Sequence, residues 1–159
     1  MSAQGRIGYR GPMQPRGDLP RIKLDLTVDE ILVLEPVARD VHHPYSDLPA
    51  DGIRIKCYCF EEVFAEKIRA LAERERPRDL YDVVHLYRHD ELDPSRSLIL
   101  STLEKKCAFK QIPVPTMDTF RNRPERDELE SEWENMLAHQ LPALPRFIQF
   151  WQVLPEVMD

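Results

Sequence analysis

The chain has 159 residues, of which 42% are hydrophobic and 31% charged, and its formal net charge is −6. This length predicts about one folded domain, and the acidic balance argues against a protein that wraps nucleic acid through a broad basic face. No stretch reaches the roughly 20 apolar residues of a membrane span, and the opening segment lacks the apolar run of a secretory signal, so we expect a cytoplasmic protein with no membrane partner.

Neither the cysteines nor one pair of histidines gives a clear sign of a metal site. Cys57, Cys59 and Cys107 are odd in number and match neither a disulfide framework nor a four-ligand zinc site, so reduced thiols are expected. His85 and His89 are one helical turn apart, a spacing that can bind zinc, but no third His or Cys stands near them in the sequence.

The sequence of the first third of the chain predicts β-strands. Residues 1–20 are rich in Gly, Pro and Arg, and the alternation of Ile7 and Tyr9 fits a short strand. Residues 21–28 alternate strictly, which predicts a half-buried strand, and residues 53–59 repeat the pattern. Residues 29–52 form a strand or loop connection. The positions predicted to face inward are Ile22, Leu24, Leu26, Val28, Ile53, Ile55, Cys57 and Cys59.

After Phe60 the hydrophobic period changes from two to about 3.6, and prolines separate the segments. We predict helices at 60–75, 78–89, 95–107, 117–140 and 145–153. Strands followed by helices indicate an α+β fold. The predicted division is a strand-rich part, 1–59, and a helical part, 60–159, that packs on it to form one compact domain.

Lys67 stands out in the first predicted helix. On a helical wheel it falls inside the apolar arc, with Val63 one turn before it and Leu71 one turn after it, while Arg74 points roughly the same way. A desolvated ammonium needs an anionic partner, either a carboxylate or a phosphate-bearing ligand. The alternative is that the flexible stem carries the ammonium out to water.

Asp79 stands out in the second predicted helix. It follows Pro77, which suits the first helical position, and a carboxylate in the first turn is favoured by the positive helix end. On a wheel, however, Asp79 falls between Val83 and Leu86, on the inward side. Lys67 and Asp79 facing one another, or facing a shared ligand, would explain both positions.

Asp25 is the third candidate, because aspartate is disfavoured in the middle of a strand. One interpretation is simple exposure on a solvated face of the sheet. The other is a magnesium ligand, since Mg²⁺ takes carboxylate oxygens held on a rigid element and leaves room for substrate phosphates.

The segments "IKLDLT", "EEVFAEKIRALAER" and "RPRDLYDVVHLY" follow in that order, and "AEKIRAL" joined to "RDLYD" within a short distance is a specific signal. In this respect the chain resembles the AbiEii/AbiGii-type nucleotidyltransferase toxin family, most closely over about residues 5–90. The resemblance implies a DNA-polymerase-β-like nucleotidyltransferase fold followed by helices.

The resemblance also implies roles for residues. Asp25 would be the third carboxylate of a Mg²⁺ site, Lys67 would contact the triphosphate, and Asp79 would be the aspartate that follows the lysine, with Asp82 as the neighbouring alternative. Arg74 would join Lys67 and Asp82 in binding the nucleotide. The implied reaction is attack of an RNA or protein hydroxyl on a nucleoside triphosphate (NTP), and the implied protein partner is an antitoxin.

One departure from the family pattern matters. The Gly-Gly or Gly-Ser turn and D-x-D pair that supply the main magnesium carboxylates are not found before Asp25. We therefore expect an incomplete or degenerate relative with negligible transfer on its own and weak nucleotide or magnesium binding, and an open sheet edge that favours a homodimer. The alternative is a non-catalytic α+β interaction module in which Lys67 and Asp79 form a structural ion pair.

Overall fold

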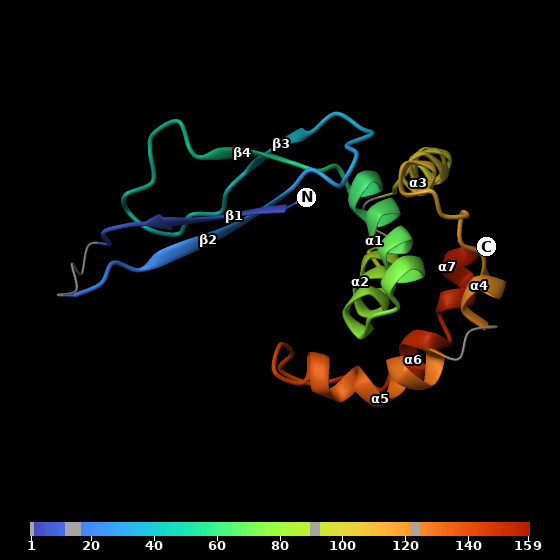
Figure 1. Cartoon of the computed structure of the whole chain (residues 1–159). Coiled ribbons are helices and arrows are strands. Elements are labelled where there is room, and N and C mark those ends of the chain that lie inside the picture. Colours follow the sequence, from blue (N-terminus) through green and yellow to red (C-terminus); the bar gives the residue numbers. More distant parts are fainter. Residues whose placement is uncertain (1, 12–16, 90–92, 122–124) are drawn as a thin grey trace. The chain divides into compact units, whose positions relative to one another are not determined.

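The computed structural model describes residues 2–11, 17–89, 93–121 and 125–159, and in these ranges strands are followed by helices (Figure 1). The α+β prediction is therefore confirmed. The chain divides into two compact units, Met1–Ile31 and Leu32–Asp159. The boundary lies after residue 31, whereas the sequence pattern pointed to a division after residue 59.

The first unit is an antiparallel hairpin of β1 (Ser2–Gly8) and β2 (Arg21–Thr27), with Ile7 opposite Ile22 and Gly5 opposite Leu24. The predicted alternation is present, but the prediction of a half-buried face is wrong. The apolar side chains are between 38% exposed, at Leu24, and 73% exposed, at Val28. A hairpin is a single layer, and its apolar face is buried only where a second layer packs on it.

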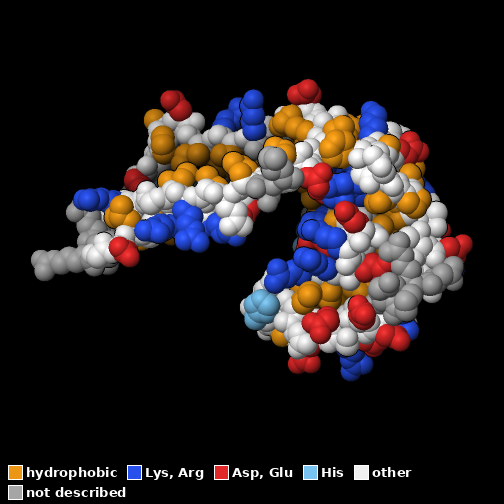
Figure 2. Space-filling view, viewed as in Figure 1, with side chains coloured by type: hydrophobic (Ala, Val, Ile, Leu, Met, Phe, Trp, Pro, Cys, Tyr) orange, Lys and Arg blue, Asp and Glu red, His pale blue; other side chains and the backbone are white. Residues whose placement is uncertain are grey.

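The second unit begins with the antiparallel pair β3 (Val37–Asp40) and β4 (Arg54–Cys57), in which Arg39 lies opposite Ile55. Ile55 is exposed, contrary to prediction, whereas Cys57 is half-buried. Apolar side chains are visible on the surface of the strand-bearing part of the chain (Figure 2).

The segment before β3 is tied to the first helix by one side chain. The Glu62 carboxylate accepts hydrogen bonds from the backbone N–H groups of Val33, at 3.2 Å, and Leu34, at 3.0 Å. These two hydrogen bonds join the segment before β3 to α1 within the second unit.

The helices of the second unit are α1 (Phe60–Arg74), α2 (Pro77–Tyr87), α3 (Arg96–Lys110), α4 (Met117–Arg121), α5 (Glu125–Leu137), α6 (Phe147–Trp151) and α7 (Leu154–Met158). The first three agree with prediction to within three residues. The single helix predicted over 117–140 is replaced by α4 and α5, with 122–124 outside the described residues and 138–140 forming a turn. The helix α7, which has Pro155 in its first turn, was not predicted.

The connection between α1 and α2 is very short. Glu75 ends α1 in the left-handed conformation, at a φ of 46°, and its N–H donates to the Leu71 carbonyl. Arg76 is extended, and Pro77 then opens α2, where its missing N–H costs nothing. This tight connection brings the end of α1 close to the first turn of α2.

Within the unit, α1 packs on α2 and α3, and α2 also packs on α5, α6 and α7. Trp133 of α5 fixes the C-terminal helices, because its indole N–H donates to the Pro145 carbonyl at 2.8 Å and its ring lies 5.6 Å from Phe147 and 5.3 Å from Phe150. The most deeply buried apolar side chains of the core are Ala65, Leu71, Leu80, Val83, Val84, Cys107, Leu129 and Leu154.

Candidate functional site

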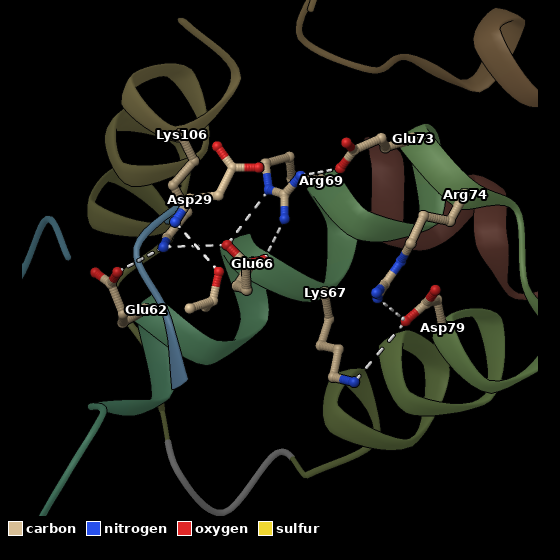
Figure 3. Close-up of polar contacts among 10 residues, drawn as sticks. Asp29, Glu62, Glu66, Lys67, Arg69, Glu73, Arg74, Asp79 and Lys106 are labelled. Atoms are coloured by element: carbon tan, nitrogen blue, oxygen red, sulfur yellow. Dashed lines mark hydrogen bonds and ion pairs between the residues drawn. The ribbon is translucent and has the colours of Figure 1, made fainter. Parts of the chain in front are cut away.

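A cluster of four charged side chains lies where α1 meets α2, and Figure 3 shows three of them. The Lys67 ammonium is 2.6 Å from Oδ2 of Asp82 and 3.9 Å from Oδ1 of Asp79. The Arg74 guanidinium donates to the same Oδ1 of Asp79 at 2.9 Å. The structure thus brings together Lys67, Arg74, Asp79 and Asp82, which we call the α1–α2 cluster.

Asp79 is the anchor of the cluster. Its side chain is 4% exposed, while that of Lys67 is 32% exposed. Oδ1 faces Arg74 and Lys67, but the buried Oδ2 has no hydrogen-bond partner within the described part of the chain. A buried carboxylate oxygen without a donor is costly, so this atom is suited to accept a hydrogen bond from a bound molecule.

The direct partner of Lys67 differs from the one expected. The sequence paired Lys67 with Asp79, but the shorter contact is to Asp82, whose side chain is 36% exposed. Asp79 is contacted more closely by Arg74, a residue that the wheel only placed on a similar face. The pairing depends on the geometry of the short α1–α2 connection, which a helical wheel does not contain.

The arrangement can bind an oxyanion. Lys67 and Arg74, two turns apart on α1, both approach one carboxylate oxygen of Asp79 on α2, and both retain exposure to solvent. Lys and Arg side chains gather over α1 and α2 on the surface of the helical unit (Figure 2). An ammonium and a guanidinium held close together offer donors in several directions, which suits the oxygens of a phosphate group.

Asp25 belongs to the hairpin unit and is described there. Its carboxylate is 61% exposed and lies 3.1 Å from the Lys23 ammonium. No group of three or more His, Cys, Asp or Glu residues able to hold a metal ion occurs in the described ranges. One exposed carboxylate paired with a lysine does not fit a two-metal magnesium site, which needs several oxygen ligands.

Sequence reasoning missed a second, more deeply buried charge network. Lys106 of α3 contacts Glu62 at 2.7 Å and Glu66 at 3.1 Å, and the side chains of Lys106 and Glu62 are 3% and 1% exposed. Arg69, also buried, pairs with Glu66 and Glu73 on its own helix (Figure 3). We call these five residues the α1–α3 network.

On a helical wheel Glu62 and Arg69 fall on the polar side of α1, opposite its apolar arc, which predicts exposure. That prediction is wrong, because both side chains are buried. The spacing of three or four residues from Glu66 to Arg69 to Glu73 is a visible sign of ion pairing along a helix. No comparable sign in the sequence reveals that Glu62 and Arg69 are buried, because α3, which packs on α1, lies far from them in the sequence.

The network shifts two pKa values. Burial alone would raise the pKa of Glu66, but hydrogen bonds and charge from Arg69 and Lys106 outweigh it, and the pKa is lowered. Burial would likewise lower the pKa of Lys106, but Glu62 and Glu66 raise it above its usual value. Burial also raises the pKa of the Cys107 thiol, which argues against a reactive thiolate there.

No helix among the residues described is long and apolar enough to cross a membrane. A family model described as "Nucleotidyl transferase AbiEii toxin, Type IV TA system" matches residues 5–156, nearly the whole chain. No curated protein and no solved structure matches.

Proposed function

Because this chain belongs to the AbiEii nucleotidyltransferase toxin family of type IV toxin–antitoxin systems, we propose that its α1–α2 cluster binds the phosphates of an NTP. The observation that carries the proposal is the convergence of the partly exposed Lys67 and Arg74 on the buried Asp79. The chain would then take part in transferring a nucleotide to a hydroxyl of RNA or protein.

Each residue has a distinct part in this proposal. Lys67 and Arg74 neutralise the phosphate oxygens, and Asp79 is a positioning residue that fixes both cations. Asp82 holds Lys67 when no phosphate is bound and has to release it, at least in part, when phosphate arrives. The family resemblance implies a role for Asp25 in the reaction, and the transfer assay tests that role separately from the α1–α2 cluster.

In the proposed reaction the acceptor oxygen attacks the α-phosphorus. A new P–O bond forms, the bond to the β-phosphate oxygen breaks, pyrophosphate leaves and the hydroxyl proton passes to a base or to water. Lys67 and Arg74 stabilise negative charge on the phosphates during this step. The family typically uses a divalent metal ion, for which the described residues of this chain do not form a site.

The family description also implies an antitoxin as the counterpart of this chain. We propose that the chain acts in the cytoplasm, where NTPs and RNA occur together. The exposed apolar side chains of the hairpin are a candidate contact for a second copy of the chain.

Equilibrium binding tests the proposal directly. Each of the four NTPs is titrated into the purified chain with and without Mg²⁺, and Lys67→Met is compared with Lys105→Met, which removes an exposed lysine of α3. We expect saturable binding that is weakened by Lys67→Met and by Arg74→Ala but not by Lys105→Met. Equal affinity in Lys67→Met and the unaltered chain would remove the basis of the proposal.

Transfer is followed separately with α-labelled NTPs and candidate RNA and protein acceptors. From the purified chain alone we expect negligible label in the acceptor. Label that appears and is lost in Asp25→Ala would show that Asp25 acts in transfer and that the missing carboxylates are not needed or are provided elsewhere. Label that persists in Asp25→Ala would show that Asp25 is dispensable.

A second candidate function rests on the same distances. Lys67 already has a carboxylate at 2.6 Å and Arg74 has one at 2.9 Å, so the cluster could serve only to join α1 to α2 in an interaction module. In that case Lys67→Met lowers the stability of the fold while the chain binds no NTP.

A further inference from the structure

Two histidine rings face each other at the C-terminal end of α2. Nε2 of His85 lies 3.3 Å from Nε2 of His89. The ring centroids are 4.8 Å apart and the planes are nearly perpendicular, at 86°. Since the nitrogens are closer than the centroids, each ring turns its Nε2 atom toward the other.

The exposed ring of His85 is supported on one side by packing. Its ring stacks on Tyr81 at 5.7 Å, with 13° between the planes, and Tyr81 in turn stacks on Phe150 of α6 at 5.1 Å. On the next turn Arg88 lies 5.0 Å from the centre of the Phe150 ring and donates to the Gln149 carbonyl at 3.2 Å. These contacts hold the end of α2 against α6, so that little freedom is lost when a ligand binds.

We propose that His85 and His89 form a binding site for a divalent transition cation of the zinc class. With metal–nitrogen bonds of about 2.05 Å, two nitrogens 3.3 Å apart subtend an angle of about 107° at the metal, close to the tetrahedral value. Neutral imidazole suits Zn²⁺, Ni²⁺ and Cu²⁺, whereas Mg²⁺ prefers oxygen ligands. The site therefore selects a different class of ion from the one that the transfer reaction uses.

The two histidines fill only part of the coordination shell. No third His, Cys, Asp or Glu joins them in a metal-binding group within the described ranges. Asp82, one turn earlier on α2, is held by Lys67 at 2.6 Å. The remaining positions of the shell can be filled by water or by a ligand atom from another molecule, as in metal sites that keep an exchangeable position.

The test is calorimetric titration of the full chain with NiCl₂ in a buffer that does not bind metal. Three variants are compared. His85→Phe keeps a flat ring against Tyr81 and removes the ligand nitrogen, His89→Ala removes the second ligand, and His139→Ala removes a single exposed histidine in the turn after α5. A Cys57→Ser, Cys59→Ser variant controls for binding by the half-buried thiols.

We expect one saturable site in the unaltered chain, in His139→Ala and in the cysteine variant. Removing residues that merely orient a metal ligand costs about 10–100-fold in affinity, so removing a ligand in His85→Phe or His89→Ala should cost at least as much. Circular dichroism checks whether each variant is folded. If His85→Phe does not fold, His89→Ala alone decides the test. Unchanged affinity in His89→Ala, or no saturable binding in the unaltered chain, would overturn the proposal.

Discussion

Lys67 lies between two carboxylates at unequal distances, 2.6 Å from Asp82 and 3.9 Å from Asp79. The nearer aspartate is half-exposed and the farther one is buried. A bound phosphate would therefore compete mainly with Asp82 for the ammonium, while Asp79 keeps the two cations in place. This competition gives the two aspartates opposite effects on anion binding.

We predict that Asp82→Asn raises NTP affinity. A partly exposed ion pair contributes about 0.2–1 kcal/mol, so releasing Lys67 should tighten NTP binding by up to about fivefold. The measurement is an NTP titration of the variant and the unaltered chain at low salt. Weaker binding in Asp82→Asn would mean that this carboxylate contacts the ligand directly.

Single residues also show how much of the α1–α2 cluster the sequence predicts. Lys67 and Asp79 were singled out because each is an ionisable residue on an apolar helical face, and the structure does bring them together. Arg74 as the closer partner of Asp79 could not be predicted, because it depends on the left-handed Glu75 that ends α1.

The packing of α1 on α3 depends on a buried lysine. Lys106 contacts Glu62 and Glu66, and Glu62 also accepts the two backbone N–H groups of Val33 and Leu34. Removing the lysine leaves buried carboxylates without their cation. Breaking a buried ion pair in this way costs about 3–5 kcal/mol.

We therefore predict that Lys106→Met lowers the free energy of unfolding by about 3–5 kcal/mol, measured by urea denaturation. The matched control is Lys105→Met, which changes an exposed neighbour and should stay within about 0.5 kcal/mol of the unaltered chain. A similar small loss in both variants would show that the α1–α3 network does not hold the helices together.

The same network predicts how stability depends on pH. The pKa of Glu66 is lowered from 4.5 in the folded state, so its contribution is complete above about pH 4.5 and is lost as the pH falls through the folded-state pKa. The pKa of Lys106 is raised from 10.5, so its contribution is complete below about pH 10.5 and is lost as the pH rises through the folded-state pKa.

Urea unfolding across this pH range gives the curve of stability against pH. Its falling part at low pH is the acid limb, and its falling part at high pH is the alkaline limb. Glu66→Gln should make the acid limb shallower, whereas Glu128→Gln, an exposed residue of α5, should leave it unchanged. An acid limb of the same slope in Glu66→Gln would assign acid sensitivity to other carboxylates.

The helices show where sequence reasoning succeeds. The period of 3.6 and Pro77 located α1 and α2 closely, because each helix carries its own apolar face and its own stop signal. Glu62, Arg69 and Lys106 were missed because their burial arises only when α1 meets α3, and no local pattern records that contact.

At the scale of the whole chain, the two compact units differ in how much they bury. The helical unit has a continuous apolar core, whereas the hairpin exposes the apolar face of both strands. An isolated two-stranded hairpin is only marginally stable in water. Alternation in the sequence predicted the two faces of this hairpin, but it could not reveal whether another layer covers one of them.

We predict that hydrogen exchange separates the two units. Backbone amides of β1 and β2 should exchange rapidly, while those in the buried turns of α1 and α2 should be protected to nearly the free energy of global unfolding. Exchange measured by mass spectrometry on the intact chain distinguishes the two segments. Equal protection in both would show that the hairpin's apolar face is covered in solution.

The environment of Trp133 has a spectroscopic consequence. The chain has two tryptophans, Trp133 in α5 and Trp151 at the end of α6. Trp133 is 4% exposed and its indole is hydrogen-bonded to Pro145, so it should emit at short wavelength. Intrinsic fluorescence will therefore report the separation of Trp133 of α5 from Phe147 and Phe150 of α6.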